Sequence, residues 1–261
     1  MTNDSAAKSF YTVLLLALVC SALVSGAAVG LRPRQDANEQ LDQKKNILRA
    51  AGLYNGQGDI NLLFSAIETK IIRLSDGTFV SKEEVDPNNF NQLKAAFNPQ
   101  TGKQLPKQED PARLNRLEKY SLIYLVHQNN TINTVILPIR GKGLWSTMYG
   151  YVALAGDLST ITGVTFYKHG ETPGLGGEIE NQDWQAGWQG KKIHDNQGKI
   201  VLRVVKGKVK ATDQDRAHRL DGISGATLTM NGINNLLMFW FGEHGFKPFL
   251  ERYKTKEGIG G

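Results

Sequence analysis

The segment YSLIYLVHQNNTINTVILPI, residues 120–139, decides the fold of this 261-residue chain. Two runs rich in apolar and β-branched residues, 120–126 and 134–139, flank a polar turn at 128–131. Strand-forming runs joined by a short polar turn are typical of a β-hairpin. The sequence therefore predicts an antiparallel pair of strands at its centre.

Further elements extend the hairpin in both directions. Strands are predicted at 149–154, 161–167 and 200–209, each bounded by glycine or aspartate. A helix is predicted to open at Asp59 and to carry Ile67 and Ile71 on its apolar face. A closing helix begins at about Leu228, where apolar residues recur at helical spacing. Hairpins with helices at the ends predict an α+β fold, a mainly antiparallel sheet flanked by helices.

The N-terminal part of the chain predicts a membrane helix. No charged residue occurs from Ser9 to Leu31, and about 20 apolar residues in a helix suffice to cross a bilayer. A signal peptide cleaved near residues 25–27 is the alternative reading. We expect two parts: 1–33 as an N-terminal tail with a transmembrane helix, and 34–261 as one domain. This domain has a helical lead-in at 38–51, which Gly52 ends.

The composition excludes several classes of protein. The net charge is +6, but the basic residues are dispersed and no basic stripe is interleaved with aromatics, so no nucleic-acid partner is expected. An anionic lipid surface or an acidic partner fits this charge better. Cys20 is the single cysteine, which excludes an intrachain disulfide and a cysteine-built metal cluster within this chain. The five histidines have no metal-site spacing, and no hydrolytic triad stands out, so neither a metal ligand nor a catalytic residue is predicted.

Three segments rich in small residues carry the candidate chemistry. Segment 140–150 places Trp145 among three glycines, and segment 169–177 is dense in glycine. Glycines let a backbone approach a flat ligand closely, and an aromatic side chain can pack against the ring of that ligand. Segment 221–229 ends in two threonines at the positive end of the closing helix, where a phosphate would bind well. Thr227 is therefore either an ordinary cap or the anchor of a phosphorylated group.

These segments also carry a resemblance. The motifs GKGLWS (141–146), ETPGLG (171–176) and DGISGAT (221–227), behind one N-terminal span, resemble those of the C subunit of the bacterial Na+-translocating NADH:quinone reductase. The last motif is shared with the wider family of extracytoplasmic FMN-binding domains. The resemblance implies that FMN is bound covalently through a phosphoester to Thr227, and that the nearby Thr229 is not the attachment site. It also implies that a separate flavin transferase makes this bond from FAD.

The resemblance assigns further cofactor-binding residues. The transferase would read Asp221 and the small residues before the threonine, and the two glycine-rich loops would supply ring contacts. The resulting candidates are Asp221, Ser224, Gly225, Ala226, Thr172, Gly174, Leu175, Gly176 and Trp145. Lys206, with Lys208, is a candidate for tuning the flavin, because a nearby cation stabilises its anionic reduced form. The competing reading places both lysines on the solvated face of a strand.

The resemblance implies a role as well as a cofactor. In this family the C subunit relays single electrons between redox centres, from an iron–sulfur centre in the membrane part towards the FMN of the B subunit and onward to quinone. It acts within a translocating oxidoreductase, a hetero-oligomer of about six subunits, and is not catalytic alone. Two alternatives are the flavin subunit of the related ferredoxin:NAD electron-transport complex and a membrane-anchored binding module without a redox role.

The expected location is the bacterial inner membrane. The resemblance implies a single-pass protein in contact with membrane lipid, with its C-terminal domain on the periplasmic side. The charges beside the span point the other way, since Lys8 precedes it while Arg32 and Arg34 follow it. We adopt the placement that the resemblance implies.

Overall fold

The computed structural model describes residues 6–129 and 131–255. The chain divides into two compact units, Met1–Gln43 and Lys44–Gly261. The predicted boundary after residue 33 stays a prediction; the helix that contains this position continues well beyond it.

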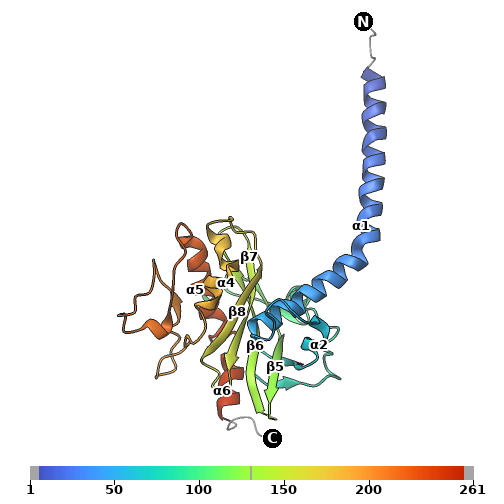
Figure 1. Cartoon of the computed structure of the whole chain (residues 1–261). Helices are drawn as coiled ribbons and strands as arrows, with labels where there is room; N and C mark the ends of the chain where they lie inside the picture. Colours follow the sequence, from blue (N-terminus) through green and yellow to red (C-terminus); the bar gives the residue numbers. More distant parts are fainter. Residues whose placement is uncertain (1–5, 130, 256–261) are drawn as a thin grey trace. The chain divides into compact units, whose positions relative to one another are not determined.

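Helix α1, Ala6–Ala50, is one continuous helix with Pro33 inside it (Figure 1). Residues 6–42 are exposed, and an 18-residue window reaches a mean hydropathy of 2.4. Among the described residues, α1 is the one helix long and apolar enough to cross a membrane. The predicted lead-in helix at 38–51 is thus the C-terminal part of α1 itself.

Gly52 ends α1, as predicted. It has a φ of +71°, a conformation that L side chains rarely adopt. The Gly52 N–H donates to the Arg49 carbonyl (3.0 Å), and the Leu53 N–H donates to the Leu48 carbonyl (2.9 Å). This pair of hydrogen bonds is the Schellman arrangement, which satisfies carbonyls that a helix end leaves free.

A six-stranded antiparallel sheet forms the centre of the second unit. Its strands are ordered β2-β1-β5-β6-β7-β8. Their bounds are β1 Ile67–Arg73, β2 Phe79–Val80, β5 Tyr120–Gln128, β6 Thr131–Lys142, β7 Thr147–Ala155 and β8 Ile161–Lys168. The predicted hairpin is β5–β6, and the strands predicted at 149–154 and 161–167 are β7 and β8. Asn130, in the predicted turn, lies outside the described residues.

Both faces of the sheet are covered, which explains why its strands are apolar on both sides. On one face Ile136 of β6 packs with Ile47 and Leu48 from the end of α1, and α2 (Ile60–Phe64) adds apolar residues. On the other face Val135 and Leu137 pack with helices α5 (Thr227–Trp240) and α6 (Lys247–Thr255). Figure 1 shows α2 and α5 on opposite sides of the sheet. The predicted α+β class is confirmed.

Short elements complete the unit. They are α3 Gln92–Phe97, β3 Gly102–Gln104, η1 Lys107–Glu109, β4 Arg116–Glu118, η2 Gly176–Glu180, α4 Gln182–Ala186, β9 Arg203–Val204, η3 Arg216–His218 and β10 Arg219–Leu220. Strands β3 and β4 pair antiparallel, and β9 and β10 pair parallel.

Two predicted elements were wrong. Asp59 does cap α2, but that helix ends at Phe64, and Ile67 and Ile71 belong to β1. Their β-branched side chains pair with β5, and sheet pairing overrides a helical spacing. The strand predicted at 200–209 shrinks to β9, because Gly207 adopts a φ of +78° that breaks an extended chain.

Candidate functional site

Helix α5 begins at Thr227, at the end of the small-residue run. Its N-cap position is occupied by Ala226, which makes no side-chain capping bond. Thr227 is exposed, and its hydroxyl makes no hydrogen bond to another described residue. The first N–H groups of a helix lack intrahelical partners and carry partial positive charge. Thr227 therefore presents a free hydroxyl at an anion-favouring helix end and is not the cap of α5.

The second threonine of the run is in a different environment. Thr229 is 1% exposed, and its Oγ1 donates to Oε2 of Glu171 at 2.6 Å. A buried hydroxyl held by a carboxylate is closed to a bulky reagent. The two threonines are thus distinguished by accessibility.

Glu171 joins the three predicted segments. Besides the Thr229 hydroxyl, its carboxylate accepts the backbone N–H groups of Leu144 (3.1 Å), Trp145 (2.9 Å) and Ser146 (3.2 Å). Burial raises the pKa of this carboxyl, but the hydrogen bonds from Thr229 and the three amides outweigh burial and lower the pKa below its ordinary value. An ionised carboxylate therefore ties segments 140–150 and 169–177 to the first turn of α5.

Glycines permit this close assembly. A Cβ at Gly143 would lie 2.6 Å from Oε1 of Glu171, and one at Gly176 would collide with the Thr229 hydroxyl. Gly225 has a φ of +73°, and a Cβ there would lie 2.7 Å from Cδ2 of Leu175. The three segments that the sequence singled out are thus in contact.

Apolar side chains remain exposed on these joined segments. Trp145 is 65% exposed and Leu175 is 43% exposed, and Leu144 and Leu228 are exposed as well. Large exposed apolar side chains gathered on adjoining segments mark binding surfaces. Together with the free hydroxyl and the helix end, they suit a flat ring that carries a phosphate.

The predicted Thr172 and Gly174 shape the loop before Leu175. The Thr172 carbonyl accepts the N–H groups of Leu175 (3.1 Å) and Gly177 (2.8 Å), and Gly174 has a φ of +75°. The tight turn holds the Leu175 side chain beside Gly225.

Asp221 and Lys206 flank the same run. Oδ1 of Asp221 accepts the Val209 N–H at 2.8 Å, and the Gly222 N–H donates to the Gly207 carbonyl at 2.7 Å. Segment 205–209 is therefore fixed beside the start of the run. Lys206 and Lys208 are exposed on this segment, which is a loop and not the predicted alternating strand.

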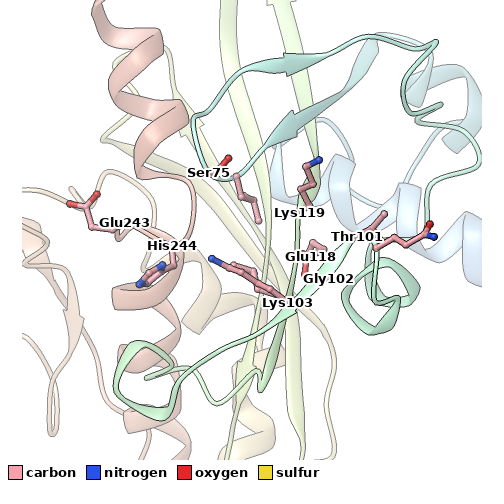
Figure 2. Close-up of a pocket in the computed structure, with 11 residues that line it drawn as sticks. Ser75, Thr101, Gly102, Lys103, Glu118, Lys119, Glu243 and His244 are labelled. Atoms are coloured by element: carbon pink, nitrogen blue, oxygen red, sulfur yellow. The ribbon is translucent and has the colours of Figure 1, made fainter.

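A separate pocket of about 420 Å³ lies elsewhere in this unit (Figure 2). It is lined by residues that follow β1, residues of β3 and β4 and beside them, and the α5–α6 connection, including Lys103, Lys119 and His244. None of the predicted cofactor-binding residues lines it, so it does not belong to the site at Thr227.

Comparison with known proteins identifies the family. Residues 143–241 match the family model of the FMN-binding domain. The chain is 43% identical, over 98% of both chains, to the C subunit of the Na(+)-translocating NADH-quinone reductase of Pseudomonas aeruginosa. It is also 43% identical to the corresponding protein of Vibrio parahaemolyticus, over 97% of both chains. The chain belongs to the NqrC family, the C subunits of Na(+)-translocating NADH-quinone reductases.

Solved structures of the NqrC family agree in fold. The crystal structure of Shewanella oneidensis NqrC matches with a TM-score of 0.76 at 35% identity and covers 84% of this chain and 99% of its own. The structure of the family member from Parabacteroides distasonis matches with a TM-score of 0.65 at 27% identity, over 84% of this chain and 96% of its own.

The FMN-binding domain match confirms FMN as the cofactor, and its covalent attachment stays a prediction. The match spans Trp145, the turn at Leu175 and the run that ends at Thr227. The roles of the individual residues stay predictions. Glu171 lies within one of the predicted motifs, and its role does not follow from the sequence, where the signal is an acid placed among glycines.

Proposed function

We propose that this NqrC family member carries FMN as a phosphoester of Thr227 and relays single electrons within a Na+-translocating NADH:quinone reductase. The observation that carries this proposal is the contrast between an exposed, unbonded Thr227 hydroxyl and a Thr229 hydroxyl buried against Glu171. Only the first is open to a modifying enzyme.

The surroundings of Thr227 suit the attachment reaction. The Thr227 oxygen would bond to the FMN phosphorus of FAD while AMP leaves, a step catalysed by a separate flavin transferase. Ser224 and Gly225, exposed and small, leave room for that enzyme to approach. The N–H groups at the start of α5 then hold the phosphoester anion.

The remaining predicted residues would hold the ring and tune it. When bound, FMN supplies the capacity to accept and release electrons, and the protein supplies position and electrostatics. Trp145 and Leu175 offer exposed apolar surface that packs on a flat ring and excludes water. Lys206 lies on the loop fixed beside Asp221 and would stabilise negative charge on the reduced cofactor.

Covalent attachment has a physical reason in the periplasm. A site filled by mass action empties once free ligand falls below its dissociation constant. Free FMN is scarce outside the cytoplasm, so an ester bond keeps the site occupied.

The membrane arrangement is also a proposal. Helix α1 exposes a long apolar surface that suits membrane lipid, and its continuity with the domain supports a retained single-pass anchor over a cleaved leader. We place this anchor in the bacterial inner membrane with the domain on the periplasmic side, among the other subunits of the complex. The match over 98% of both chains to a sodium-pump relative favours this complex over the ferredoxin-linked one.

Fluorescence on a denaturing gel tests the attachment. We expect a flavin band from the full chain co-expressed with the transferase. The band should disappear in Thr227→Val and persist in the matched control Thr229→Val. A flavin band that persists in Thr227→Val would contradict the attachment of FMN to Thr227.

A further inference from the structure

We propose that Glu171 is a positioning residue of the flavin site: its carboxylate fixes the turn bearing Leu144 and Trp145 against α5 and lowers the flavin reduction potential. The inference rests on the proposed attachment at Thr227, and it concerns a residue to which neither the motif nor the family match gives a role.

The carboxylate is fully engaged by neutral donors. Its oxygens accept three consecutive backbone N–H groups, from residues 144–146, and the Thr229 hydroxyl. With 5% of its surface exposed, Glu171 is largely shielded from water. Four hydrogen bonds to an anion keep it ionised at neutral pH.

Glu171 has no direct ion-pair partner among the described residues. Among the hydrogen bonds and ion pairs of residues 6–129 and 131–255, no lysine, arginine or histidine side chain reaches this carboxylate. The buried Glu118 differs, since Arg140 forms a bidentate ion pair with it. Glu171 therefore holds a negative charge against the first turn of α5 without a direct ion-pair partner, while the Lys142 ammonium bonds to the Trp145 carbonyl of the same turn.

This placement has a direct electrostatic consequence. The start of α5 stabilises anions, and the charge of Glu171 opposes that field. A flavin gains negative charge on its ring upon reduction, so a carboxylate bonded to the turn that bears Trp145, the proposed ring contact, disfavours the reduced form. Neutralising Glu171 should raise the reduction potential.

The placement also has a geometric consequence. Three hydrogen bonds hold the turn from Leu144 to Ser146, whose apolar side chains remain exposed. Without the carboxylate, three amides lose their acceptor and the turn is free to move. The absorption spectrum of a ring packed on Trp145 would then change.

The test is a redox titration of the full chain, co-expressed with the transferase and followed by flavin absorbance. We compare the wild type with Glu171→Gln, which removes the charge, and Thr229→Val, which removes one hydrogen bond and keeps the charge. We expect a higher midpoint potential in Glu171→Gln and a near wild-type potential in Thr229→Val. Equal potentials in all three proteins would overturn the proposal.

Two further results keep the test decisive. If Glu171→Gln does not accumulate, Glu171→Asp replaces it in the comparison. This variant keeps the negative charge but has a shorter side chain, which places the carboxylate farther from the N–H groups of residues 144–146. A near wild-type potential with an altered flavin spectrum is then expected, and a raised potential would overturn the proposal.

A wild-type chain without covalent flavin would contradict the proposed function, whereas attached flavin with unchanged potentials contradicts only the role of Glu171.

Discussion

At the scale of single residues, Glu171 makes stability depend on pH. Its hydrogen bonds lower the pKa of the folded state below the ordinary value of 4.5, so the unfolded chain takes up the proton first on acidification. The stabilisation is present above about pH 4.5 and is lost as the pH falls through the folded-state value. We expect acidification to lower the melting temperature of the wild type more than that of Glu171→Gln.

Thermal unfolding at a series of pH values checks this prediction. Thr229→Val is the intermediate control, since it removes the side-chain hydrogen bond that lowers the pKa. Parallel pH profiles for the wild type and Glu171→Gln would show that Glu171 makes no such contribution.

The place of Thr227 at a helix start was predictable from its motif, whereas the contacts of Glu171 were not. The motif and the helical spacing after it are local in sequence, so Thr227 could be placed at a helix start. Glu171 acts on a turn about 26 residues away and on a threonine 58 residues away. Only the folded sheet brings these partners together, and periodicity carries no signal of it.

At the scale of elements, a buried ion pair braces the strand that leads into segment 140–150. Nη1 of Arg140 lies 2.7 Å from Oε1 of Glu118, and both side chains are buried. The Arg140 guanidinium also lies over the Trp240 ring of α5, 5.4 Å from its centre. Removing one partner of a buried pair leaves an uncompensated charge. We expect Glu118→Gln to lower the free energy of unfolding by about 3 kcal/mol.

Urea denaturation measures this loss. The matched control is Glu68→Gln, which breaks half-exposed contacts with Lys70 and His127 and should cost less than about 1 kcal/mol. Equal losses in the two variants would mean that the Glu118–Arg140 pair does not brace β6.

Secondary-structure elements were predictable where the spacing of apolar residues fits only one kind of element. They were not predictable where the same spacing fits both a helix and a strand. The β5–β6 hairpin follows from two strand-forming runs around a turn. Ile67 and Ile71 are four residues apart, a spacing that fits a helix face as well as one face of a strand. In the structure both residues belong to a strand, because they pair with Val126 and Leu122 of β5. A pairing between residues so far apart in sequence cannot be inferred from the spacing within a short stretch of the chain.

At the scale of the whole molecule, the end of α1 belongs to the second unit. Ile47 and Leu48 are buried under the sheet, whereas residues 6–42 are exposed. A chain that begins at Lys44 should leave the membrane fraction and keep the stability of the domain. A chain that begins at Leu53 also lacks the buried Ala50 and should lose about 1.5–3 kcal/mol for each of the larger side chains, Ile47 and Leu48.

Fractionation followed by urea denaturation of the two truncated chains tests this division. Equal stability of both truncations would show that the end of α1 is not part of the domain core. The boundary predicted after residue 33 marks the end of an apolar span, which charge and hydropathy indicate, and it stays a prediction; the start of a packed core has no such local signal.

The most direct test of the central claim is a mass measurement on the mature chain. The tryptic peptide that begins at Leu220 contains both threonines, and its fragment ions separate them. We predict that this peptide carries the mass of one FMN less one water and that the fragments place it on Thr227. An unmodified peptide from protein co-expressed with the transferase, or an adduct on Thr229, would contradict the account.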